Sequence, residues 1–183
     1  IITGDAARAA AEYAAKTAYK ETDAATYQAM EALVHNLNTM NSRAGAQVPF
    51  SSLNYGTDTS PEGRMAVHNL LRATEAGLGD GETPIFPVQI FKVKEGVNYN
   101  EGDPNYDLFR HALRCSAKRL FPNFSFLDAP FNLQYYKPGD YNTEVAYMGC
   151  RTRVMGNVFD NTKEVTCGRG NLSFTSINLP RIG

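Results

Sequence analysis

Residues 84–93 read PIFPVQIFKV, a nearly continuous apolar run. Such a run is typical of a β-strand covered on both faces, as the strands of parallel sheets are. Two further stretches predict strands: residues 48–55, which end at Gly56, and residues 123–127. The apolar run therefore predicts a buried strand within a sheet of parallel type.

Helices are predicted between these strands. Residues 60–62, Ser-Pro-Glu, place serine at an N-cap and proline at the first helical position, and this helix should run to about Leu78 and stop at Gly79. A further helix is expected to begin at residues 103–104, Asp-Pro. Four residues are expected on its inner side: Tyr106, Phe109, Leu113 and Leu120. Strands that alternate with helices at this spacing predict parallel βαβ units of an α/β domain.

The first forty residues are predicted to be helical. Residues 6–20 are rich in Ala, Glu and Lys, and Thr22 or Asp23 can cap a second helix. Six apolar residues of that helix recur at three- and four-residue steps: Tyr27, Met30, Leu33, Val34, Leu37 and Met40. This spacing puts them on one helix face, which must pack on another part of the protein.

The alternation stops after Phe131, where a polar stretch rich in Gly and Tyr begins. We expect an irregular excursion from about residue 135 to residue 165, followed by a last strand over residues 172–179. Long connections in compact domains are usually functional or disordered. The excursion therefore becomes a candidate functional segment.

Composition excludes several classes of protein. The 183 residues are 43% hydrophobic and 20% charged with a net charge of −1, which fits a soluble globular protein without a basic field for nucleic acid. No apolar run approaches the roughly 20 residues that cross a bilayer, and the start lacks a secretion signal. We expect a cytoplasmic protein that binds neither nucleic acid nor membranes. The absence of an initiator Met suggests a piece of something longer.

Three widely spaced cysteines fit neither a disulfide framework nor a zinc site. Cys115 falls in a predicted helix and is interpreted as a buried apolar residue, and Cys167 carries no motif. Cys150 lies in the excursion after Gly149, which permits an unusual backbone angle, and before two arginines that would lower the thiol pKa if they point toward it. A small residue that fills space at a loop tip is the alternative.

The remaining polar features favour structural roles. Residues 168–171, Gly-Arg-Gly-Asn, would let a ligand approach the backbone, but a plain tight turn explains them better. Three acidic residues lack calcium-loop spacing and predict a turn and a helix N-cap: Glu101, Asp103 and Asp107. Three histidines on predicted helices show neither metal-ligand spacing nor a nucleophile–base arrangement: His35, His68 and His111. No metal or cofactor site is expected in this chain.

Five stretches of the sequence are informative through the identity of their residues, beyond the spacing of apolar and polar positions. They are residues 41–56 (NSRAGAQVPFSSLNYG), 82–87 (ETPIFP), 118–124 (KRLFPNF), 147–153 (YMGCRTR) and 168–178 (GRGNLSFTSIN). The blocks are similar to the anaerobic, glycyl-radical class of ribonucleotide reductases, and the similarity covers nearly the whole chain from about Leu33. Because the blocks are long and occur in the family's order and spacing, the resemblance is specific.

The resemblance implies part of a ten-stranded α/β barrel with a finger loop, preceded by helices. Residues 1–40 would be the helical segment and residues 41–183 a partial catalytic barrel, with the finger at about residues 135–165. Cys150 matches the cysteine at the fingertip, which a glycyl radical converts to a thiyl radical that removes the 3′ hydrogen of a ribonucleotide. Asn171 matches the family's active-site asparagine, and Met148 matches a methionine of the members that use formate.

The resemblance also implies groups and partners outside these residues. The glycyl radical, made by a radical-SAM activating enzyme, the zinc site and the ATP and dATP effectors belong to the intact enzyme, which is expected to be a homodimer. Its substrates would be a ribonucleoside triphosphate and formate. Because the glycyl-radical motif, the zinc cysteines and the ATP-cone are missing here, we expect the chain alone to be inactive. Two alternatives are another glycyl-radical enzyme and a non-catalytic nucleotide-binding module.

Overall fold

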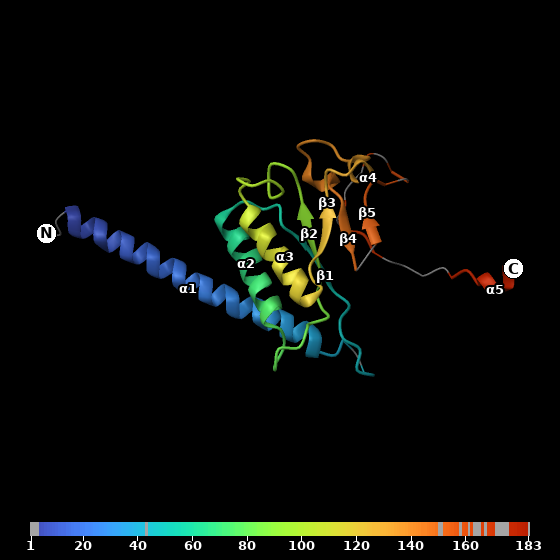
Figure 1. The fold of residues 1–183 in the computed structure, drawn as a ribbon, viewed down its shortest axis with the longest axis horizontal. Coiled ribbons are helices and arrows are strands. Elements are labelled where there is room, and N and C mark those ends of the chain that lie inside the picture. The colour runs from blue at the N-terminus through green and yellow to red at the C-terminus, as the bar shows by residue number, and fades with distance from the viewer. Residues whose placement is uncertain are drawn as a thin grey trace.

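The computed structural model describes residues 4–42, 44–149, 152–157, 159–160, 162, 166, 168–170 and 176–182. It is a mixed α/β structure built on a three-stranded parallel sheet. Helices α1, α2 and α3 lie on one side of this sheet, and a two-stranded hairpin lies on the other (Figure 1). The predicted α/β class is confirmed, while the ten-stranded barrel stays a prediction.

Helix α1 spans Gly4–Thr39 without a break, so the prediction of two helices is wrong. The carboxylate of Asp23 accepts a hydrogen bond from the Asn69 amide at 2.8 Å instead of capping a helix start. Neither Gly nor Pro occurs between residues 5 and 39 to interrupt the helix. Among the described residues, no helix is both long enough and apolar enough to cross a membrane.

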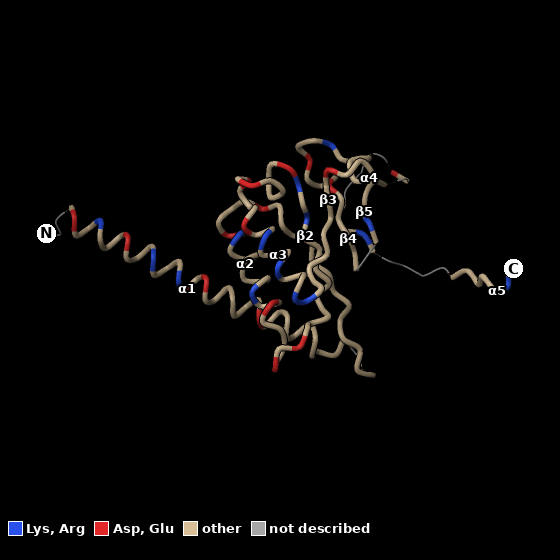
Figure 2. The backbone as a smooth tube through the Cα atoms, viewed as in Figure 1, with Lys and Arg blue, Asp and Glu red and all other residues tan. Residues whose placement is uncertain are grey.

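The two halves of α1 differ in their surroundings. The first half projects from the body of the molecule, and acidic and basic residues are interspersed along it (Figures 1 and 2). The second half packs on α2, as the apolar spacing predicts, through a cluster that includes Val34, Leu70 and Ala73 with Tyr27 and Met30 beside it. Met40, at 53% exposure, lies outside this contact.

The sheet contains β1 (Ser52–Tyr55), β2 (Val88–Val93) and β3 (Asn123–Phe126) in that order, and all pairs are parallel. This arrangement confirms the predicted βαβ units. Helix α2 (Pro61–Ala76) begins as expected, since the Ser60 hydroxyl accepts a hydrogen bond from the Gly63 amide. It ends two residues early, where the Arg119 guanidinium donates to the carbonyls of Glu75 and Ala76.

Helix α3 spans Tyr106–Arg119 and starts after the predicted residues 103–104, because the Asp103 carboxylate closes a turn on the Asn100 amide. Its buried side is formed by Leu108, Ala112 and Cys115, at steps of four and three residues. Phe109 packs beside them as expected. Two residues predicted on the inner side are exposed instead: Leu113 (45%) and Leu120 (80%).

Between residues 130 and 154, the described part of the chain is more regular than the predicted excursion. Short helices span Pro130–Leu133 (α4) and Tyr141–Thr143 (η1), and β4 (Ala146–Met148) pairs antiparallel with β5 (Thr152–Val154). The predicted strand over residues 172–179 falls partly outside the described residues. In its described part no strand forms, and the short helix α5 starts at Leu179 and ends at Ile182.

Phe91 is the centre of the main core. Its side chain is fully buried and contacts the rings of Tyr55, Phe109 and Phe124 at centroid distances of 5.7–6.1 Å. These rings come from both neighbouring strands and from α3. One side chain on β2 therefore joins the sheet to its helical layer.

Replacing Phe91 with alanine should lower the free energy of unfolding by about 3–5 kcal/mol, because the lost ring leaves a cavity. Phe126→Ala is the matched control, since this ring on β3 is 52% exposed, and its effect should be about 0.5 kcal/mol. Urea unfolding followed by circular dichroism measures both values. Equal losses in the two variants would contradict the central placement of Phe91.

Candidate functional site

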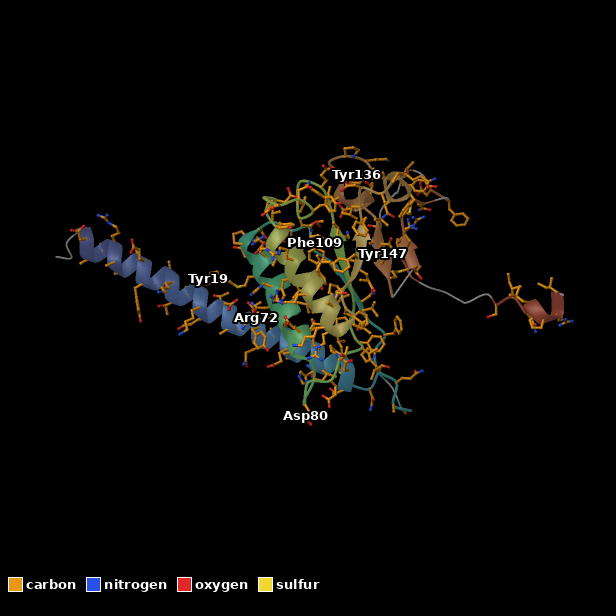
Figure 3. The ribbon with its side chains drawn as sticks, viewed as in Figure 1. Tyr19, Arg72, Asp80, Phe109, Tyr136 and Tyr147 are labelled. Atoms are coloured by element: carbon orange, nitrogen blue, oxygen red, sulfur yellow. The ribbon has the colours of Figure 1, made fainter. Side chains whose placement is uncertain are left out.

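The two faces of the sheet carry different side chains. On β1, Leu53 and Tyr55 pack toward the helices. Their neighbours Ser52 and Asn54 point the other way and contact the hairpin. Figure 3 shows the same division, with Phe109 on the helical side and Tyr147 on the hairpin side of the sheet. The candidate site is therefore the hairpin and the sheet face beneath it.

Strand β4 is attached to β1 by side chains rather than by a backbone ladder. The Asn54 amide nitrogen donates to the Tyr147 carbonyl at 2.8 Å, and its oxygen accepts from the Tyr147 N–H at 2.9 Å. The Ser52 hydroxyl accepts from the Gly149 N–H at 3.1 Å. Two side chains thus hold Tyr147 on β4 and Gly149 directly after this strand.

The ring of Tyr147 adds an apolar contact beneath the hairpin. It packs against a cluster of buried residues on and before β2: Phe86, Val88 and Ile90. Val145, two residues earlier, is 1% exposed. The start of the hairpin is thus held by packing as well as by hydrogen bonds.

A buried ion cluster holds the chain just before β4. The Glu144 carboxylate lies 2.9 Å from the Lys92 ammonium and 3.5 Å from that of Lys94, and these side chains are 8%, 14% and 23% exposed. Burial by itself lowers the pKa of Lys94, but the hydrogen bond to Tyr136 and the charge of Glu144 outweigh it and raise the pKa. Lys94 is therefore a cation at neutral pH.

Of the three predicted site residues, the structure describes Met148, which lies in this hairpin. Met148 is half-buried on β4 and pairs with Thr152 on β5. Cys150 and Asn171 lie outside the described residues. Gly149 has a φ of +58°, which confirms the predicted unusual backbone angle, and a Cβ there would meet the Phe50 ring at 3.0 Å. A residue with a side chain would therefore be strained at this position.

The neighbouring arginines are engaged in different ways. Arg153 on β5 lies over the Phe131 ring, 5.3 Å from its centroid, so it contacts α4. Arg151 lies outside the described residues. Arg169, from the Gly-Arg-Gly turn, donates to the Gly156 carbonyl at 2.8 Å. This contact gives Arg169 a role in holding two loops together.

The other titratable candidates have structural partners. His111 is buried beside the Glu75 carboxylate at 3.2 Å, and burial lowers the pKa of this histidine despite that partner. Cys115 is fully buried, as predicted, and burial raises the pKa of its thiol to about 11. Within the described ranges, no three His, Cys, Asp or Glu residues come together as metal ligands.

Sequence reasoning missed the residues that hold the hairpin. Ser52 and Asn54 alternate with apolar residues in the predicted strand, and this alternation indicates one polar face. Nothing in the sequence pairs that face with residues nearly a hundred positions later. The sequence does not predict the buried position of Glu144 either, since a single carboxylate in a polar stretch is usually exposed on the surface.

The family model described as anaerobic ribonucleoside-triphosphate reductase matches residues 4–183. The chain belongs to this family. It is 36% identical over 157 residues to the anaerobic ribonucleoside-triphosphate reductase of Escherichia coli (strain K12), which covers 85% of this chain and 21% of that protein. The protein of the same name from Enterobacteria phage T4 is 37% identical over 166 residues, covering 90% of this chain and 26% of the relative.

A third relative of the same name, from Salmonella typhimurium, is 35% identical over 166 residues. The family assignment confirms the resemblance that the five sequence blocks carry. The chain spans between a fifth and about a quarter of the length of these relatives. The activity of these relatives is therefore a proposal for this chain.

Lys92→Met should destabilise the protein by on the order of 3 kcal/mol, because Glu144 keeps a buried charge with a weaker partner. Adding Glu144→Gln should restore part of the loss, giving a coupling of about 1–3 kcal/mol in a double-mutant cycle. The exposed pair Arg8–Asp5, whose side chains are 72% and 94% exposed, is the control and should show no measurable coupling. Independent effects of the Lys92 and Glu144 substitutions would contradict the buried pair.

Cys115 should resist alkylation in the folded protein. With a thiol pKa of about 11, only about one thiol in a thousand is ionised at about pH 8, and the thiolate is the nucleophile. Peptide mass spectrometry after iodoacetamide treatment should find Cys115 unmodified without denaturant and modified in urea. Equal modification under both conditions would contradict its burial.

Proposed function

We propose that this chain supplies part of the catalytic subunit of an enzyme that reduces ribonucleoside triphosphates to 2′-deoxyribonucleoside triphosphates by thiyl and glycyl radical chemistry. The family match over residues 4–183 carries the proposal. The geometry supports it, because the segment that contains Cys150 in the sequence follows a strand anchored to the sheet at Tyr147 and Gly149.

Cys150 is proposed as the radical carrier. A glycyl radical elsewhere in the enzyme takes the hydrogen atom of the Cys150 thiol, so that an S–H bond breaks, a C–H bond forms and a thiyl radical remains. The thiyl radical takes the 3′ hydrogen of the ribose, and the 2′ hydroxyl leaves with a proton as water. Formate gives up two electrons and its hydrogen and becomes carbon dioxide, so that a C2′–H bond replaces the broken C2′–O bond. The thiol returns a hydrogen atom to C3′, which restores the thiyl radical.

Two further residues are proposed to act beside Cys150. The Asn171 amide would hydrogen-bond the ribose hydroxyls or the reductant. Met148, on the anchored strand β4, would belong to the formate-dependent form of the reaction. An anchored strand suits the role of Met148, since catalytic groups need support from rigid elements.

The wider organisation is part of the same proposal. Residues 1–40 are a helical segment, and residues 41–183 are part of a ten-stranded barrel whose finger covers about residues 135–165. The intact enzyme is a cytoplasmic homodimer activated by a radical-SAM enzyme, with zinc and with ATP or dATP as effectors. The parallel sheet with helices on one face supports the barrel, since such a sheet is its repeating unit.

In the intact enzyme, Cys150→Ser should abolish deoxyribonucleotide formation and leave folding nearly unchanged. Serine is close to isosteric, but its O–H bond is too strong to exchange a hydrogen atom with a carbon radical. The glycyl radical should still form, and electron paramagnetic resonance under anaerobic conditions measures it. Nucleotide binding should survive, because affinity comes from the surrounding pocket.

Cys115→Ser and Cys167→Ser are the controls for this variant. Both should keep turnover, with a stability loss on the order of 1 kcal/mol at most. Wild-type turnover by Cys150→Ser with the radical present would remove Cys150 from the mechanism. In that case the proposed reaction would lose its central residue.

A further inference from the structure

We propose that Asn54 and Ser52 are positioning residues, which fix the strand before Cys150 so that hydrogen-atom transfer can occur. The proposal rests on the function proposed above, and it adds two residues on β1 to the site. Neither residue needs to touch the substrate. Both act on the backbone of residues 147 and 149.

The Asn54 contact fixes both the position and the orientation of β4. One planar amide engages both the N–H and the carbonyl of Tyr147, at 2.9 and 2.8 Å. Two parallel hydrogen bonds of this kind resist both sliding of β4 and its rotation about its own axis. The Ser52 contact to the Gly149 N–H then fixes the strand two residues later, at the residue bonded to Cys150.

The support under these side chains is rigid. β1 pairs with β2 along its whole length, and its apolar residues pack into the cores beneath the helices. The Tyr55 hydroxyl and the Gln89 amide oxygen lie 2.6 Å apart, and the Gln89 nitrogen donates to the Thr74 hydroxyl at 2.8 Å. The position of the hairpin is therefore set by the core of the α/β unit.

Polar residues at these two positions specify register in a way that apolar ones would not. β4 and β5 have three residues each, and a two-stranded hairpin is only marginally stable by itself. Apolar side chains at positions 52 and 54 would hold the hairpin by packing but would allow it to slip. A slip of one residue would turn every side chain of β4 to the opposite face.

The test uses the intact, activated enzyme. In Asn54→Ala, kcat should fall by roughly 10- to 100-fold, since a misplacement of about 1 Å has an effect of this size. KM for the nucleotide should stay within roughly twofold of wild type, because the contacts that bind the substrate and the transition state equally are unchanged. The glycyl-radical signal should also be unchanged. Ser52→Ala should show a smaller loss of kcat. Ser52→Thr keeps the hydroxyl that accepts from the Gly149 N–H and should therefore keep wild-type activity.

A structural readout accompanies the kinetics. Amide hydrogens of residues 145–149 should exchange roughly tenfold faster in Asn54→Ala, because the Tyr147 N–H loses its acceptor and β4 loses its attachment to β1. Asn54→Asp gives a pH-dependent check. Its protonated carboxyl offers one donor and one acceptor in the shape of the amide. Its turnover relative to wild type should therefore rise as the pH falls, whereas that of Asn54→Ala should not.

Asn69→Ala is the matched control. The fully buried Asn69 amide joins α1 to α2 on the helical side, donating to the Asp23 carboxylate at 2.8 Å and accepting from the Arg72 guanidinium at 2.8 Å. Its removal should reduce stability as Asn54→Ala does. It should leave kcat and the exchange of residues 145–149 unchanged.

Wild-type kcat in Asn54→Ala would overturn the positioning role, and so would equal losses of kcat in Asn54→Ala and Asn69→Ala. Failure of the proposed function would give a different result, namely turnover by Cys150→Ser with the radical present. The two failures are therefore distinguishable in the same set of assays.

Discussion

Burial of β2 on both faces is the constraint on which the described structure depends. Phe91 on one face requires an apolar helical layer, which α2 and α3 supply. Lys92 on the other face requires a counter-charge, because an unpaired buried ammonium is strongly destabilising. Glu144 meets this need at 2.9 Å. One strand thereby brings together an N-terminal α/β unit and a segment fifty residues further along the chain.

The end of β1 shows how closely these parts are packed. Gly56 has a φ of +122°, and a Cβ there would lie 2.8 Å from the Lys92 carbonyl. The amides of Asn98 and Asn105 both donate to the Gly56 carbonyl, at 3.0 and 3.1 Å. Two buried asparagines thus replace the hydrogen bonds that the strand loses as it leaves the sheet. A glycine is required because only it tolerates both the angle and the approach.

Sequence reasoning predicted the parallel sheet because strongly apolar strands and capped helices carry local signals. The run before and through β2 and the Ser60 cap are of this kind. It failed where partners distant in sequence decide the outcome. Asp23 reads as a helix cap but binds Asn69. The size of Leu113 suggests a place on the inner side of α3, although helical periodicity from Leu108 selects Ala112 and Cys115. For the site, the sequence points to Cys150 but not to Asn54. The contact of Asn54 with Tyr147 forms only when β4 packs next to β1 in the folded chain.

The radical chemistry proposed for the intact enzyme gives a reason for anchoring the hairpin by directional contacts. A thiyl radical reacts with many C–H bonds, so selectivity for one hydrogen must come from position. Packing alone fixes a strand less well than hydrogen bonds do, since apolar contacts are non-directional. The amide of Asn54 and the ion pair of Lys92 with Glu144 are both directional, and they hold the chain on either side of Val145. The polar face of the sheet therefore does what an apolar face could not. It specifies one register for the strand before Cys150, while the apolar face supplies the stability on which that register rests.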